Sequence, residues 1–190
     1  MNIINKILEI IKSFFDKQEI NNKNDIVIDN TNKEENIMEN QITKNFTLAE
    51  LTYSDTAKAK KLNNTPSELE YNNMKTLCEK VLQPLRDKLG KPIRINSCYR
   101  GLQLNEAVGG SKTSQHCKGQ AADIEIMGMS NYDLACYIRD NFDFDQLILE
   151  FTDNIKNDIN AGWVHVSYVS PTANRKQCLT INKSGTKLGF

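Results

Sequence analysis

The period of the hydrophobic pattern changes near residue 92, and this change constrains the fold more than any other feature of the chain. Between residues 67 and 89 apolar side chains recur at helical spacing, from a Ser67–Glu70 capping pair to a helix-ending Gly90. Beyond that point the pattern is mostly that of strands, with a short helix predicted at the start of 101–114 and a helical stretch over 130–142. The strand-like segments are 93–100, 120–126, 145–151, 162–169 and 176–182. Helices followed by strands predict an α+β fold with a small, mostly antiparallel sheet and flanking helices.

The first 44 residues carry a different pattern. Residues 1–20 place isoleucine, leucine and phenylalanine at helical spacing, and charged residues interrupt the apolar run. This predicts an amphipathic helix rather than a secretory signal peptide. We expect it to pack on the domain or on a second copy, with contact to a membrane surface or a partner protein as the alternative. Residues 21–44 are rich in Asn, Asp, Glu and Lys, which predicts a polar linker, so the compact domain is expected over 45–190.

The composition excludes several classes of protein. The 190 residues include 24 basic and 24 acidic side chains, so no nucleic-acid partner is predicted. The five cysteines form no CxxC pair, which argues against a disulfide framework and for synthesis in a reducing compartment. No apolar run reaches the ~18 residues that a membrane-spanning helix needs.

The chain has only two histidines, and both stand beside strand-like segments. Alternation in "WVHVSY" places His165 on the polar face of its strand, and alternation in "AADIEI" places Asp123 and Glu125 on one face of theirs. If the two strands share a sheet, Asp123 and His165 converge. His116 precedes Gly119, where the chain can turn tightly and bring the imidazole back towards Asp123.

Two imidazoles and one carboxylate are a recognised ligand set for zinc. A catalytic zinc site uses three protein ligands and leaves a fourth position for water, whose pKa falls towards ~7. The alternative for each residue is an ordinary polar side chain on a half-buried strand, or a carboxylate in a turn or an ion pair.

Residues 114–126 together with 163–168 resemble the zinc-dependent D-alanyl-D-alanine carboxypeptidase family of peptidoglycan peptidases. The family signature is Ser-x-His-x-x-Gly-x-Ala-x-Asp followed by Trp-x-His. It stands here as Ser114, His116, Gly119, Ala121, Asp123, Trp163 and His165. The likeness covers about residues 45–182, and the fold it implies is the small antiparallel sheet shared with hedgehog signalling domains.

The resemblance also implies roles for individual residues. It implies zinc bound by His116, Asp123 and His165, and an Arg100 beside the metal that holds a substrate carboxylate or carbonyl. A guanidinium suits this role because it is always charged and can grip a carboxylate through two hydrogen bonds. Ser114 and Gln115 are further candidates for substrate binding, or residues that shape the turn.

The chain departs from the family pattern in two places. Cys98 replaces the glycine of Ser-Gly-Tyr-Arg, and Gly162 occupies the position, three residues before the final histidine, where many members carry the general base. A base must then come from elsewhere. Our candidate is Glu150, which ends the apolar strand "DQLILE", since such a carboxylate can have a raised pKa. Glu125 is the reserve candidate because it shares a face with Asp123.

These residues predict a zinc metallopeptidase that cleaves an amide bond in the peptide stem of bacterial peptidoglycan. The activity expected is that of a D-Ala-D-Ala carboxypeptidase or an endolysin-like endopeptidase. The alternative is a non-catalytic, zinc-containing cell-wall-binding module. The sequence shows no recognisable signal peptide, so we expect synthesis in the cytoplasm and action on the cell wall. An Asn- and Lys-rich wall peptidase of this kind suits a phage lysis or virion protein, or a bacterium of low-GC type.

Overall fold

The computed structural model of the protein describes residues 38–151 and 161–190. The helix expected over 1–20 and most of the expected linker lie outside these residues. The helices are α2 (Leu48–Leu51), α3 (Asp55–Lys60), α4 (Glu68–Leu77), the π-helical η1 (Cys78–Leu82), α5 (Gln83–Leu89), α6 (Leu102–Ala107), the 3-10 turn η2 (Gln115–Lys118) and α7 (Asn131–Asn141). The strands are β1 (Gln41–Thr43), β2 (Phe46–Thr47), β3 (Arg94–Ser97), β4 (Ala121–Glu125), β5 (Gln146–Glu150), β6 (Trp163–Ser167), β7 (Gln177–Asn182) and β8 (Gly185–Leu188).

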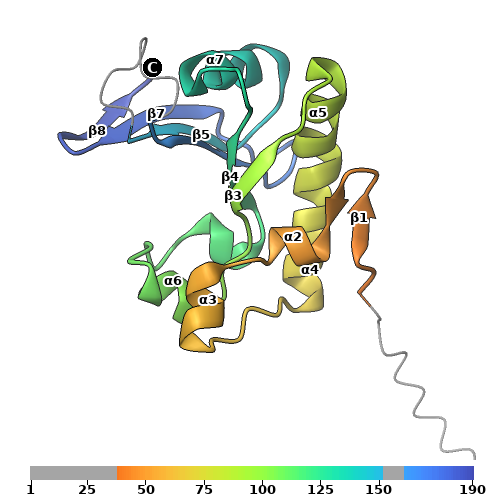
Figure 1. The fold of residues 1–190 in the computed structure, drawn as a ribbon. Coiled ribbons are helices and arrows are strands. Elements are labelled where there is room, and N and C mark those ends of the chain that lie inside the picture. The colour runs from red at the N-terminus through yellow and green to blue at the C-terminus, as the bar shows by residue number, and fades with distance from the viewer. Residues whose placement is uncertain (1–37, 152–160) are drawn as a thin grey trace, which may run out of the picture. The chain divides into compact units, whose positions relative to one another are not determined.

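The strands form a two-stranded sheet, β1-β2, and a six-stranded sheet in the order β3-β4-β6-β5-β7-β8. Every neighbouring pair in the larger sheet is antiparallel except β5 and β7, which run parallel. The helix α7 lies against this sheet, while α3, α6 and η2 gather at its other side (Figure 1). The predicted α+β class and the mostly antiparallel sheet are confirmed. Within the described residues, none of the helices is both long and apolar enough to cross a bilayer.

The long helical segment begins and ends where the sequence predicts. Ser67 and Glu70 form a capping box at its start, and Gly90 ends it in the left-handed region at φ 61°. The middle widens into the π-helical turn η1, in which the N–H of Gln83 donates to the carbonyl of Cys78. This turn comes just before Pro84, which has no N–H to donate, so the widening accommodates the proline. The helical spacing of apolar residues over 67–89 predicts a buried Leu69, and this is wrong, since Leu69 in the first turn is 67% exposed.

The core lies between this helical segment and the apolar face of the sheet. The buried side chains of the helices include Met74, Leu77, Val81, Leu82 and Leu85. Those of β4, β5 and β6 are Ala122, Ile124, Leu147, Leu149, Val164 and Val166. Full burial of one aliphatic side chain stabilises the fold by about 1.5–3 kcal/mol. The alternation therefore acts as predicted: apolar residues fix the sheet against the helices, and the polar residues between them are turned to the opposite face.

The segment just before the expected domain start packs with the domain. Strand β1 pairs with β2, and Ile42 within it is buried. The side chain of Gln83 on α5 accepts hydrogen bonds from the Thr43 hydroxyl at 3.1 Å and the Asn45 backbone N–H at 3.0 Å. The expected boundary at residue 44 thus falls beside a strand that is tied to the long helical segment.

Candidate metal centre

Asp123 and His165 are brought together by strand register. They lie directly opposite each other on the adjacent antiparallel strands β4 and β6, and both are buried. Side chains at directly opposed positions of an antiparallel pair lie within contact distance. The Nδ1 atom of His165 lies 3.0 Å from Oδ1 of Asp123. The predicted convergence of these two residues on the polar face of the sheet is what the structure shows.

His116 reaches the same point from the turn η2. The turn ends at Gly119, whose φ of 66° is in the left-handed region, and a Cβ there would lie 2.3 Å from the backbone oxygen of Glu70. Glycine is therefore required for both conformation and space. The Nδ1 atom of His116 lies 2.7 Å from the Cys98 carbonyl oxygen. Since a carbonyl only accepts, Nδ1 carries the proton, and Nε2 presents its lone pair to the cluster.

Three potential ligand atoms, one each from His116, Asp123 and His165, lie within 4.8 Å of one another. Nε2 of His116 is 3.2 Å from Oδ1 of Asp123 and 3.1 Å from Nδ1 of His165. Nε2 has no proton to give, and Nδ1 of His165 can carry only one. At least one of the three close contacts therefore joins two lone pairs unless a cation lies between them. The donor set consequently fits a bound metal ion.

Burial and charge favour the forms of these side chains that bind metal. Burial lowers the pKa of His116, although the neighbouring Asp123 opposes that shift, so the imidazole is neutral. Burial acts to raise the pKa of Asp123, but the contacts with His116 and His165 outweigh it and lower the pKa. The carboxylate is thus ionised at neutral pH. A neutral imidazole and an ionised carboxylate are the protonation states that zinc requires.

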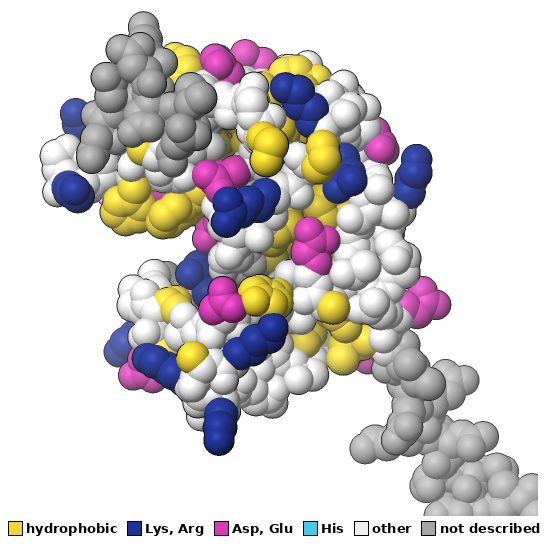
Figure 2. Space-filling view, viewed as in Figure 1, with side chains coloured by type: hydrophobic (Ala, Val, Ile, Leu, Met, Phe, Trp, Pro, Cys, Tyr) yellow, Lys and Arg dark blue, Asp and Glu magenta, His cyan; other side chains and the backbone are white. Residues whose placement is uncertain are grey.

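A cleft of about 950 Å³ opens over the cluster. Its lining includes residues near α3 and α6 on one side and residues of β5, β6 and β7 on the other. Figure 2 shows the described surface hollowed between these two parts of the domain. The candidate substrate residues Arg100 and Ser114 both line the cleft.

Arg100 lines the cleft and has one guanidinium nitrogen without a partner among the described residues. Its Nε is buried and has no hydrogen-bond partner among residues 38–151 and 161–190. Its backbone N–H donates to the carbonyl of His116 at 3.2 Å, which ties it to the metal-site turn. Trp163 also lines the cleft with a buried Nε1 that lacks a partner in the described part of the chain. A buried donor without an acceptor lowers the stability of the folded state, and an acceptor group on a bound ligand would remove this cost.

Glu150 lies close to the cluster, and Glu125 does not line the cleft. Glu150 is paired with Trp163 across β5 and β6. This pair lies two residues along the strands from the pair that contains His165. Burial raises the pKa of its carboxyl, Asp123 adds to that rise, and His165 and Arg100 oppose it. Glu125 accepts a hydrogen bond from the Asn96 amide at 2.9 Å and pairs with Arg94 at 3.7 Å. Of the two candidate bases, only Glu150 lines the cleft that opens over the cluster.

Gly162 is a glycine for steric reasons. Its φ is 70°, and a Cβ at this position would lie 1.7 Å from the carbonyl oxygen of Glu150. A carboxylate at residue 162 is therefore incompatible with the way β5 and β6 meet. The other departure from the family pattern, Cys98, is buried, and burial raises the pKa of its thiol well above the usual range. Such a thiol is a poor nucleophile.

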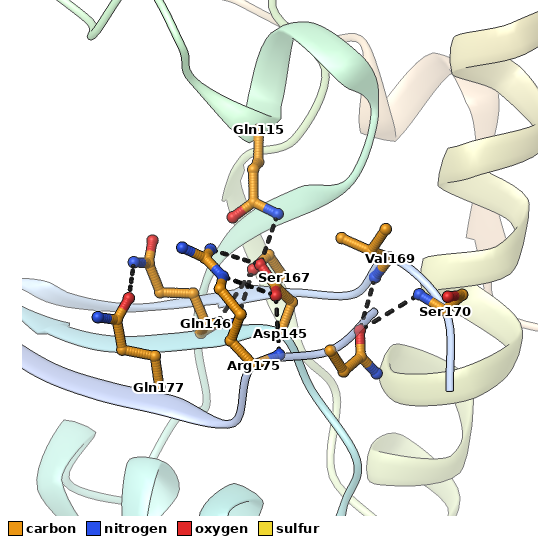
Figure 3. Close-up of polar contacts among 9 residues, drawn as sticks. Gln115, Asp145, Gln146, Ser167, Val169, Ser170, Arg175 and Gln177 are labelled. Carbon is orange, nitrogen blue, oxygen red and sulfur yellow. Dashed lines mark hydrogen bonds and ion pairs between the residues drawn. The ribbon is translucent and has the colours of Figure 1, made fainter. Parts of the chain in front are cut away.

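Sequence reasoning missed a polar group beside Gln115. Buried Asp145 accepts hydrogen bonds from the side chains of Gln115 and Arg175 (Figure 3). Arg175 and Gln146 also line the cleft. The only available signal was an aspartate directly before an apolar strand, which by itself is typical of a turn.

An α+β domain with a His–Asp–His cluster at the base of a cleft has the arrangement of a metal-dependent hydrolase. A family model described as Peptidase M15 matches residues 44–158, more than half of the chain, and the protein belongs to that family. This confirms the resemblance to zinc D-Ala-D-Ala carboxypeptidase-like peptidases. The matched range contains His116, Asp123 and Glu150, while His165 follows it. No curated protein matches the chain.

Proposed function

We propose that the protein is a zinc-dependent peptidase that hydrolyses an amide bond in the peptide stem of bacterial peptidoglycan. The observation that carries the proposal is the set of three potential metal ligands on His116, Asp123 and His165, which fits a bound cation, inside the cleft of a Peptidase M15 member. His116 Nε2, Asp123 Oδ1 and His165 Nδ1 would hold the ion. Zinc bound to three protein ligands supplies a polarised scissile carbonyl and a water of lowered pKa.

Glu150 is the proposed general base. Its carboxylate is half-buried at the end of β5, next to the pair formed by Ile148 and His165. It takes a proton from the attacking water and passes it to the nitrogen of the leaving amine. Burial raises its pKa towards the working pH, and a base with such a pKa is more effective than an exposed carboxylate.

Arg100 is the proposed substrate-holding residue. Its guanidinium stands in the cleft with a buried, unpartnered Nε, and it donates to a carboxylate or to a carbonyl oxygen of the stem peptide. The cleft of about 950 Å³ has room for several residues of the stem peptide, and the bond that we propose is an internal one rather than the terminal D-Ala-D-Ala bond. The proposal is accordingly an endolysin-like endopeptidase acting at the cell wall.

Digestion of purified cell wall tests this function. The zinc-loaded protein should release peptide fragments whose masses identify the bond, a chelator should abolish the release, and added zinc should restore it. Release of single D-alanine would instead identify a carboxypeptidase. Binding to the wall without release of any fragment would contradict the peptidase proposal and support a non-catalytic wall-binding module. His165→Ala, which should lose the metal, is the negative control.

A further inference from the structure

Asp145 organises one end of the cleft. Its side chain is only 2% exposed and precedes β5. It accepts four hydrogen bonds, one from the side chain of Gln115 and three from the backbone and guanidinium of Arg175 (Figure 3). These contacts join the metal-site turn, the start of β5 and the segment before β7. The side chains of Gln115 and Arg175 are therefore held in fixed positions on the wall of the cleft.

The hydrogen bond to Asp145 fixes which end of the Gln115 amide faces the cleft. Gln115 Nε2 donates to Oδ2 of Asp145 at 2.9 Å. An ionised carboxylate only accepts, and the Arg175 contacts lower the pKa of Asp145, so the amide cannot be flipped. The free group is the oxygen Oε1, a hydrogen-bond acceptor. In Figure 3 it points to the side on which Arg175 and Gln146 lie.

Arg175 contributes a hydrogen-bond donor whose positive charge is compensated by Asp145. Its Nε and Nη2 donate to Asp145 at 2.9 and 2.5 Å, so the buried carboxylate compensates the guanidinium. Nη1 meets no acceptor among the described residues, and Arg175 lines the cleft. A guanidinium paired in this way still donates hydrogen bonds, but it attracts a further anion less than an unpaired one. Arg100, in contrast, has no such carboxylate partner in the described part of the chain.

Gln146, the first residue of β5, is the third polar side chain at this end of the cleft, beside Gln115 and Arg175. In the structure its Nε2 donates to Oε1 of Gln177 at 2.7 Å, and in this orientation its own Oε1 is left as a second acceptor. Gln146 lies on the same face of β5 as Ile148, which is paired with His165. Two residues along a strand span about 7 Å, the length of about two residues of an extended peptide. The end of the cleft thus offers two acceptors and one donor about two peptide residues from the cluster.

We propose that Gln115, Gln146 and Arg175 form a subsite for an uncharged amide group of the substrate and disfavour a carboxylate. A carboxamide donates to the two amide oxygens and accepts from Nη1 of Arg175. A carboxylate in the same place would face two oxygens that repel it and a guanidinium that Asp145 has already compensated. This inference rests on the proposed peptidase function. It narrows the substrate to stem peptides in which the acidic residue near the cleaved bond is amidated.

Two synthetic stem peptides test the subsite. They differ only in whether the side carboxyl group about two residues from the cleaved bond is free or amidated. The unmodified protein should cleave the amidated peptide with a kcat/KM about 10-fold higher or more, since a mispaired polar site gives discrimination of at least this size. Equal values, or a preference for the free carboxylate, would overturn the proposal.

Charge variants at Gln146 provide the matched controls. Gln146→Lys brings a cation into the subsite and should reverse the preference towards the free carboxylate. Gln146→Glu keeps the size of the side chain, adds an anion and should strengthen the preference for the amide. Neither substitution touches the cluster, so zinc content should be unchanged in both. If both variants discriminate as the unmodified protein does, the group bound at this end is not the one proposed.

A binding measurement separates this proposal from the proposed function. The same two peptides are titrated calorimetrically into the zinc-loaded protein. If the protein cleaves neither peptide but binds the amidated one about 10-fold more tightly, the peptidase function fails and the subsite stands. If it cleaves both with equal kcat/KM and binds them equally, the function stands and the subsite fails.

Discussion

Two buried aspartates in this domain differ in what neutralises their charge. Asp145 is 2% exposed and has the guanidinium of Arg175 hydrogen-bonded to both of its oxygens. Asp123 is 6% exposed, and its described partners are the imidazoles of His116 and His165. A buried carboxylate that is paired with a guanidinium has its charge compensated within the protein, while one whose partners are imidazoles can be compensated by a bound metal ion. This difference supports a structural role for Asp145 and the proposed metal-ligand role for Asp123.

The largest effect should come from Asp123→Asn. The amide keeps the shape of the side chain but removes the negative charge that attracts the cation. Zinc content should fall from about one equivalent to a small fraction of that, and activity should fall with it. Elemental analysis and the rate of fragment release measure the two results, and full zinc retention would contradict the assignment.

Glu150→Gln should be next in size. The amide keeps hydrogen-bonding reach but cannot accept a proton, so the rate should fall by about 10²-fold or more while zinc stays bound. Glu125→Gln is the matched control, since Glu125 does not line the cleft and its side chain contacts Arg94 and Asn96. The check is the rate of fragment release together with zinc analysis. A near-normal rate in Glu150→Gln would remove Glu150 from the mechanism.

Asp145→Asn should lower stability without loss of zinc, whereas Asp123→Asn should lose zinc. The substitution leaves Arg175 without its carboxylate partner and weakens the hydrogen bonds that the buried side chain of residue 145 accepts. The expected cost is about 2 kcal/mol of unfolding free energy. Zinc should be retained, because Asp145 contributes no atom to the cluster. Urea unfolding of the zinc-loaded protein measures the loss. Stability equal to that of the unmodified protein would mean that the Arg175 contacts contribute nothing net.

The pH dependence of this stability is a smaller test. The hydrogen bond from Arg175 holds the pKa of Asp145 below its ordinary value of about 3.9. The unfolded state therefore binds the proton first, so the contribution is fully present above about pH 5 and is lost as the pH falls through the folded-state pKa. The difference in unfolding free energy between the unmodified protein and Asp145→Asn should shrink below about pH 4. A difference that stays constant to pH 3 would contradict this.

The smallest effect should come from shortening the N-terminus. A chain that begins at residue 38 keeps β1, and a chain that begins at Lys44 lacks it. Both should retain zinc and the rate of cleavage. The shorter chain should be less stable by about 1–2 kcal/mol, since it loses the buried Ile42 and the pairing with β2. Thermal unfolding of both chains distinguishes them, and loss of zinc in either would place the N-terminal segment in the core.

The cluster was predictable because its geometry follows from local rules. Strand alternation turned Asp123 and His165 to one face, and a tight turn at Gly119 returned His116 to them. The Asp145–Arg175 pair was not predictable, because it depends on β7 lying parallel to β5, a pairing that no local pattern encodes. The reason for Gly162 was also hidden, since it is a contact with the backbone of another strand.

Two short elements were missed for a different reason. The strand β8 has every residue exposed, so it shows no alternation of apolar and polar side chains. The helix α3 is rich in alanine and lysine and buries only Ala57, so it shows no apolar stripe. Both form because neighbouring segments hold them: β8 pairs with β7, and Ser54 caps α3 by accepting from the Ala57 N–H. Patterns of hydrophobicity cannot reveal elements that bury so little.

The contact between His116 Nδ1 and the carbonyl of Cys98 has an evolutionary consequence. The oxygen that orients this histidine belongs to the main chain, which every residue type carries. Replacement of the side chain at position 98 therefore leaves the orientation of His116 intact, provided that the path of the backbone is kept. For this contact the glycine of the family pattern and the cysteine found here are equivalent, because the side chain at position 98 takes no part in it and packs in the core instead.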